Sequence, residues 1–389
     1  MKGGATLVGV AAAVFSLWSA AAFSQAATPA PQDDDGWLRR KLIDPEDGKL
    51  DASAFLESAY GFVPVATIIT DPAVGYGGGL GLVFIQPDKD ATGKFARPDI
   101  TAVAGFATEN GTWGAGAMDS RNWRDGRLKT LGGAFYASAN LEFFGDPNGA
   151  AGDTPLKYNL LTYGAVAEAR NKIGESQGWL GLRYIAAKVD TTFDMGNLVP
   201  GIDPRDYEQT LSGLTPLVSY DSRNNIFTPT EGTFAEASFA VFSESIGSDR
   251  DFEIATLTGI WYHPIGEKFN FGIKSDLSAS FDGTPFYLRP YAQLRGLQSL
   301  RLQGENAFDL EAEVRWQGWT RWSLLAFAGG GSAWQGFTDF DRARSVATGG
   351  VGIRYLVARK FGLHMGFDIA FGPDDPIIYF QFGSAWFRP

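Results

Sequence analysis

The side chains that most often carry chemistry are scarce in this sequence, which contains two histidines and no cysteine. His263 precedes Pro264 at the end of a predicted strand, and His364 stands four residues before Asp368. Residues four apart on a strand share a face. His364 and Asp368 therefore form either a hydrolytic pair or a polar pair in the protein interior. No serine nucleophile motif accompanies them, so we expect no catalytic residue and no enzyme.

A group of carboxylates lies near the N-terminus, at Asp44, Glu46, Asp47 and Asp51. Carboxylates this dense can bind calcium, but their spacing does not match the alternate-position ligands of an EF-hand loop. The proline and glycine between them are typical of turns. We predict a turn that leads into a short helix or plug, and we expect neither a metal site nor a cofactor.

The strongest candidate is Arg295, which is followed by Gly296 inside a strand-like region. Glycine reaches φ > 0 without steric cost, so the pair suits a tightly folded loop. A buried guanidinium favours carboxylate partners, and Asp276, Glu311 and Glu313 lie on the strands predicted on either side. Arg295 either pairs with these carboxylates in an interior or caps a surface loop.

The segments around this loop alternate strictly, which indicates strands with one apolar and one polar face. In the strand after the loop, Leu310, Ala312, Val314 and Trp316 oppose Glu311, Glu313 and Arg315. In a later strand, Leu363, Met365, Phe367, Ile369 and Phe371 oppose His364 and Asp368. The apolar rows face either lipid or the core of a soluble sandwich, and periodicity alone does not separate the two. The segment from 252 to 263 is apolar on both faces, so its direction is open.

The 389-residue chain is long enough for two soluble domains or one large β-structure. Its apolar residues are dispersed, and no segment beyond the N-terminal region reaches the ~18 to 20 apolar residues of a membrane helix. Without such a helix, only a closed barrel satisfies the backbone in lipid. The net charge of −11 excludes nucleic acid as a partner, because phosphate binding needs basic patches.

The N-terminus has the pattern of an export signal. Residues 1–26 contain an early lysine, a short apolar stretch and small residues ending at Ala26, which predicts a cleaved signal peptide; the alternative is a membrane anchor. Residues 27–62 predict a flexible periplasmic segment, and they are too few for a further folded domain.

The motif "LRGL … DLEAEVRW … LLAFAGGGSAW" resembles the BamA/TamA-like superfamily of outer-membrane proteins, also called the bacterial surface antigen family. The resemblance runs from about Phe55 to Trp386. It implies an all-β fold, a transmembrane antiparallel β-barrel of about 16 strands at 63–389, with an inward-folded Arg-Gly loop. Relatives place an aspartate where this chain has Gly329, so Glu313 becomes the expected partner of Arg295. The short N-terminal segment implies a form without POTRA domains.

The resemblance also predicts a weak lateral seam between the first strand, 64–70, and the last, 376–386. Proline removes a ladder donor and the glycines after the first strand make its neighbour pliable. The seam residues that we single out are Pro64, Ile68, Phe380, Phe382 and Trp386. The last strand resembles an assembly signal, with Trp386 in place of the usual terminal phenylalanine. The segment from Asp221 to Gly232 resembles a family turn, to which we assign no role.

The export signal and the resemblance together imply a protein of the bacterial outer membrane, and the resemblance implies that it assists translocation or membrane insertion of protein or lipid. The alternative is a passive diffusion channel or a structural barrel. The partners expected are outer-membrane lipid, the barrel assembly machinery for its own insertion, and a protein or lipid client.

Overall fold

The computed structural model describes residues 41–58, 63–86, 99–143, 156–194 and 205–388. The predicted signal peptide at 1–26 lies outside these residues, as does most of the predicted segment 27–62. Among the described residues, no helix is long and apolar enough to cross a membrane.

Sixteen strands in sequence order form one antiparallel sheet. Their bounds are β1 (Val63–Ile69), β2 (Gly77–Gln86), β3 (Asp99–Thr108), β4 (Trp113–Trp123), β5 (Leu128–Phe143), β6 (Leu156–Lys172), β7 (Gly178–Asp194), β8 (Arg205–Asp221), β9 (Gly232–Phe242), β10 (Phe252–Ile265), β11 (Phe269–Ser280), β12 (Asn306–Trp316), β13 (Trp322–Trp334), β14 (Arg344–Ala358), β15 (Leu363–Phe371) and β16 (Ile377–Phe382). The helical elements are α3 (Ser53–Ser58) and the short 3₁₀ turns η2 (Glu244–Ile246), η3 (Phe286–Leu288), η4 (Asp339–Arg342) and η5 (Arg359–Phe361).

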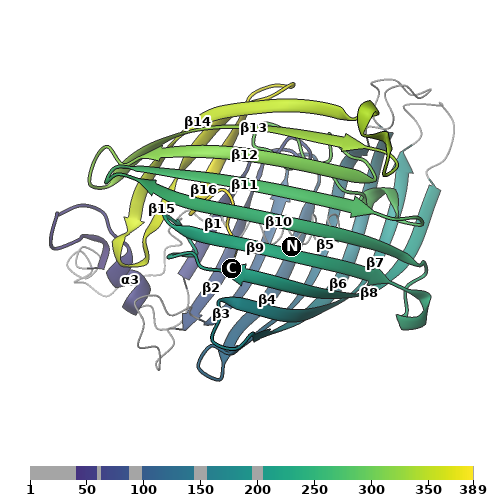
Figure 1. Cartoon of the computed structure of the whole chain (residues 1–389), viewed down its shortest axis with the longest axis horizontal. Helices are drawn as coiled ribbons and strands as arrows, with labels where there is room; N and C mark the ends of the chain where they lie inside the picture. Colours follow the sequence, from purple (N-terminus) through teal and green to yellow (C-terminus); the bar gives the residue numbers. More distant parts are fainter. Residues whose placement is uncertain (1–40, 59–62, 87–98, 144–155, 195–204, 389) are drawn as a thin grey trace.

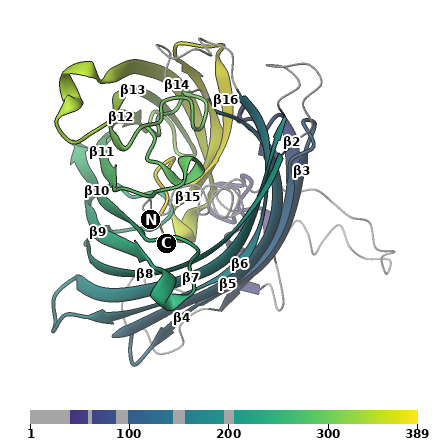
Figure 2. The same cartoon turned by 90° about the vertical axis from the view of Figure 1, so that its right-hand side faces the viewer.

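The sheet curls into a nearly closed barrel (Figures 1 and 2). Antiparallel ladders join each strand to the next from β1 to β16. Within the described residues, no ladder returns from β16 to β1, and these edge strands, with seven and six residues, are the shortest of the sixteen. The prediction of an all-β, sixteen-stranded antiparallel barrel is confirmed.

The outer face carries the apolar rows that the alternation predicted. Phe269, Leu277 and Phe281 of the β11 region are all more than 40% exposed, whereas Lys274 and Asp276 between them are buried. An apolar exterior is what a barrel surrounded by lipid requires.

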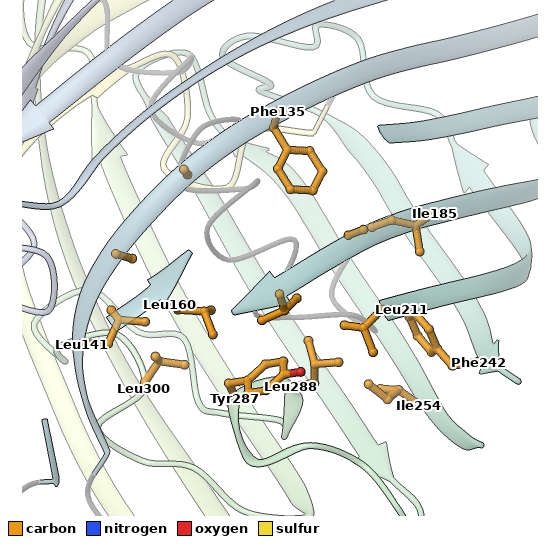
Figure 3. Close-up of a cluster of buried hydrophobic side chains, with 14 of the residues drawn as sticks. Phe135, Leu141, Leu160, Ile185, Leu211, Phe242, Ile254, Tyr287, Leu288 and Leu300 are labelled. Atoms are coloured by element: carbon orange, nitrogen blue, oxygen red, sulfur yellow. The ribbon is translucent and has the colours of Figure 1, made fainter. Parts of the chain in front are cut away.

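The inner face is less uniformly polar than the alternation predicted. A buried cluster joins inner residues of β5 to β10 with Tyr287, Leu288 and Leu300 of the β11–β12 connection (Figure 3). This cluster settles the direction of β10: Phe252 and Ile254 face the cluster, and Leu257 and Trp261 face outward. The strand is apolar on both faces because lipid meets one side and packed side chains meet the other.

Most predicted strand ends lie within two residues of the observed ones. Two predictions were wrong. β8 begins at Arg205, whereas the sequence pattern predicts a strand from Thr210 to Ser222, and β16 ends at Phe382, so Trp386 is not part of the last strand.

Candidate functional site

The Arg295 side chain lies at the centre of a buried group of charges. Its guanidinium forms ion pairs with Glu311 at 2.8 Å, Glu313 at 2.8 Å and Asp368 at 2.9 Å. The ring of Phe327 lies 3.6 Å from the guanidinium carbon, a cation–π contact. We call Arg295, Glu311, Glu313 and Asp368 the Arg295 cluster. It joins the β11–β12 connection, residues 281–305, to β12 and β15.

The backbone on either side of Arg295 is held as well. Arg295 N–H donates to Glu311, and Gly296 N–H donates to the hydroxyl of Tyr379 on β16. Gly296 has φ +88, and a Cβ there would lie 2.8 Å from the carbonyl oxygen of Phe371. Glycine is therefore required both by the left-handed conformation and by the close approach to β15.

Asp368 of the cluster is shared between two arginines. Arg354 of β14 binds it with both terminal nitrogens, at 2.6 and 2.8 Å, while Arg295 binds one of its oxygens. Sequence reasoning placed Asp368 beside His364 and missed both arginines. The sequence did show Asp368 on the polar row of β15. No neighbouring residue, however, indicated that this row contacts a loop 73 residues away.

Glu313 pairs with Arg295 as the sequence led us to expect, but Glu311 makes more contacts with it. Glu311 accepts from both Arg295 N and Nε and pairs with Nη2. Asp276 is not brought to Arg295, and that assignment was wrong. Its carboxylate pairs with Lys274 at 2.7 Å and accepts from the Thr258 hydroxyl.

Lys274 also fixes the loop through Gln293. The lysine Nζ donates to the Gln293 carbonyl at 3.1 Å and pairs with Asp309 at 2.7 Å, and Asp309 accepts from Gln293 N–H at 3.1 Å. Both backbone polar groups of one loop residue are thus bound to β11 and β12.

The glycines of β13 receive the loop's apolar side chains. A Cβ on Gly331 would lie 2.8 Å from Ala292 and 3.1 Å from Leu294, and one on Gly329 would lie 2.9 Å from Leu294. Position 329 therefore has no aspartate side chain, and the strand there offers a surface without side chains, onto which the loop packs. Leu294, Leu297 and Leu302 are buried there.

The predicted seam residues do not form one group. The Pro64 backbone lies opposite Leu82 in β2, and Ile68 is half exposed. Phe380 stacks edge-on to Phe367 of β15, with ring centroids 5.2 Å apart. Phe382 faces Phe227 of the β8–β9 connection at 6.4 Å.

Trp386 does not lie at the seam. It is buried among Phe234, Ile260 and Tyr262, which face inward from β9 and β10. The error follows from extending β16 by the alternation rule through Gly383, whose φ of +78 ends the strand.

The N-terminal carboxylates surround Arg321 of the β12–β13 turn. Asp44, Asp47 and Asp51 lie 2.5, 2.6 and 2.5 Å from its nitrogens, and Arg321 is fully buried. Asp51 also accepts from Arg359 N–H. The described part of the segment that we expected to be flexible is therefore attached to the barrel, and its carboxylates bind arginine.

Comparison with known proteins identifies the fold. An Omp85 superfamily domain matches residues 114–385. BamA from Haemophilus ducreyi lacking POTRA domains 1–3 superposes with TM-score 0.53 at 15% identity, covering 90% of this chain and 81% of that one.

Two CdiB structures are also similar. CdiB from Escherichia coli has TM-score 0.57 and 10% identity over 82% of this chain, and CdiB from Acinetobacter baumannii has 0.54 and 12% over 83%. The chain spans 61% and 59% of those two proteins. No curated protein matches the chain.

Barrels of this family are transport and assembly proteins rather than enzymes. The family model covers well over half of the chain, from the start of β4 to the tail after β16. The protein belongs to the Omp85 superfamily of outer-membrane β-barrels.

Proposed function

We propose that residues 281–305 fold into the barrel lumen as a plug, and that the barrel passes a protein or lipid client sideways into the membrane. The observation that carries the proposal is the Arg295 cluster. Its carboxylates lie on the inward rows of β12 and β15, whose alternate residues face outward. A loop side chain that reaches them must enter the lumen.

The energetics of the cluster support a firmly seated plug. A buried guanidinium is costly to desolvate, and that cost is offset only when carboxylates pair with it closely. Arg295 has three such partners. Removing the arginine leaves the buried Asp368 with Arg354 and the buried Glu311 with the indole of Trp386, and leaves Glu313 partly buried, so the loop loses its strongest attachment.

The seam between β1 and β16 supports a lateral route. Both edge strands are short, and a proline in β1 lacks a ladder donor. The neighbouring β2 begins with three glycines, Gly77 to Gly79, which lower its stiffness. Separating these edges breaks fewer backbone hydrogen bonds than separating any two adjacent strands inside the sheet.

The test is single-channel conductance of the purified, refolded protein and its Arg295→Ala variant in planar bilayers. The matched control is Arg127→Ala, because Arg127 lies in an exposed turn, where it pairs with the exposed Glu175 and donates to Gly174 O. We expect small, brief currents for the natural protein and the control, and larger or longer openings for Arg295→Ala.

Large, steady currents that are identical in all three proteins would contradict the plug. The barrel would then be a passive diffusion channel, with Arg295 contributing only to the stability of a loop.

A further inference from the structure

The C-terminal tail, residues 383–388, leaves the barrel wall directly after β16. Gly383 N–H donates to His364 O at 2.7 Å, and Ser384 N–H donates to Phe227 O at 2.6 Å. A Cβ on Gly383 would lie 2.6 Å from that same Phe227 oxygen. The chain therefore passes from β15 to the β8–β9 connection within two residues.

The β8–β9 connection, residues 222–231, forms the seat of this tail. Arg223 donates to Arg388 O at 2.8 Å, and the Phe227 and Phe387 rings stack with centroids 6.0 Å apart. Asn225 donates to Phe361 O at 2.8 Å, which ties the connection to the β14–β15 turn. The family-like segment that had no assigned role thus holds the end of the chain.

Trp386 extends from the tail to the Arg295 cluster. Its indole N–H donates to Glu311 Oε1 at 2.6 Å, and Glu311 is the carboxylate that contacts Arg295 most. The ring packs 5.8 Å from that of Tyr262. Gly272 of β11 leaves room for it, because a Cβ there would lie 2.8 Å from the indole.

We propose that Trp386 is a positioning residue that links movement of β16 to release of the plug, an inference that rests on the proposed function. Trp386 follows the end of β16 by four residues, and four extended residues span at most about 14 Å. When β16 moves away from β1, the tail is drawn after it and the indole leaves Glu311. Glu311, a partner of Arg295, then loses the charge-assisted hydrogen bond from the indole when the seam opens.

The test measures the frequency of large openings in Trp386→Phe, which keeps an aromatic ring but loses the indole N–H. A hydrogen bond to a charged group corresponds to about a tenfold or larger change in an equilibrium, so we expect openings about tenfold more frequent. The matched control is Trp322→Phe, because Trp322 is exposed on the outer face of β13. The folded fraction of each variant is checked by heat-dependent gel mobility.

A second arm separates coupling from a purely structural role. The chain has no cysteine, so two can be introduced by Ile68→Cys and Ile378→Cys. Both positions lie on the outer face of the edge strands, and a bifunctional maleimide joins the two new cysteines. We expect the crosslink to suppress channel openings in the protein that keeps Trp386. The additional openings caused by Trp386→Phe should persist in the crosslinked protein.

Combining Trp386→Phe with Arg295→Ala is expected to add nothing to Arg295→Ala alone, because both act on the same ion pairs. Full additivity, or a Trp386→Phe protein that opens like the natural one at equal folded fraction, would overturn the coupling. If Arg295→Ala itself has no effect, the plug proposal fails instead, so the two failures are distinguishable.

Discussion

At the scale of single residues, three adjacent glycines of β13 have different surroundings. Gly329 and Gly331 face the β11–β12 connection, where an added Cβ would meet Leu294 or Ala292 at 2.8–2.9 Å. Gly330 between them points the other way, and its Cβ would meet Val346 O at an ordinary 3.6 Å. Comparing substitutions at Gly330 and at Gly331 therefore separates the effect of strand propensity from that of loop packing.

We predict that Gly331→Ala displaces the loop while Gly330→Ala does not. Overpacking of a closely packed site costs about 1–3 kcal/mol, which corresponds to roughly 5- to 150-fold in the balance between seated and displaced loop. Conductance recordings should show more frequent openings for Gly331→Ala alone. Equal behaviour of the two variants would mean that the loop does not press on β13.

Part of this site could be predicted from the sequence. The Arg-Gly pair and the inward row of β12 follow from residue type and local alternation, and the Arg295–Glu313 pair was expected from the family resemblance. Asp368 and Arg354 could not be assigned, because their contact with Arg295 depends on how far the loop reaches across the barrel. Asp276 was misassigned for a different, local reason: Lys274, two residues earlier on the same face, pairs with it.

At the scale of elements, the attached N-terminal segment links the chain before β1 to the turns of β12–β13 and β14–β15. Ala52 N–H donates to Val357 O, and Tyr355 donates to Leu50 O. β1 begins later in the chain, at Val63, so the same stretch of sequence leads into the first edge strand. Most carboxylates of the attached N-terminal segment pair with Arg321.

Acid should detach this segment. The hydrogen bond from Arg321 holds the pKa of Asp47 at about 2, below its ordinary value of 3.8. Burial acts to raise the pKa of Asp51, but hydrogen bonds from Arg321 and Ser53 lower it overall. Carboxylates with depressed pKa values stabilise the attached state above their ordinary pKa. That stabilisation is lost as the pH falls from about 4 towards 2.

The measurement is limited proteolysis of residues 41–62 in detergent-solubilised protein. A low-pH protease such as pepsin should cleave this stretch increasingly as the pH is lowered. Arg321→Gln should be cleaved there at neutral pH by a protease such as proteinase K, whereas Arg127→Gln should stay protected. Protection in Arg321→Gln equal to that of the natural protein would show that the backbone contacts alone hold the segment.

Most element boundaries were predictable where alternation was continuous, and the end of β16 was not, because a backbone contact ended that strand. The pattern Ile378, Phe380, Phe382 continues in the sequence to Trp386, but a tight approach to Phe227 at Gly383 redirects the chain. Both faces of β10 are apolar, so the sequence did not show which one points inward. The side chains that pack on its inner face come from a connection that follows the next strand.

At the scale of the whole molecule, the β11–β12 connection makes two kinds of contact with the inner face of the sheet. Towards one end, an apolar cluster joins β5 to β10 with Tyr287 and Leu288. On the side of β11 to β15, buried ion pairs around Lys274 and Arg295 hold the middle of the same connection. Sixteen-stranded barrels are otherwise wide enough to leave an aqueous channel, so under the proposed function we expect this one connection to decide whether the barrel conducts.

The most direct test of that claim is the conductance of a chain in which residues 286–303 are replaced by a short Gly-Ser linker, with folding verified by heat-dependent gel mobility. We expect a large, steady pore, in contrast to the small, brief currents of the natural protein. A folded variant whose currents match those of the natural protein would show that the connection does not fill the lumen.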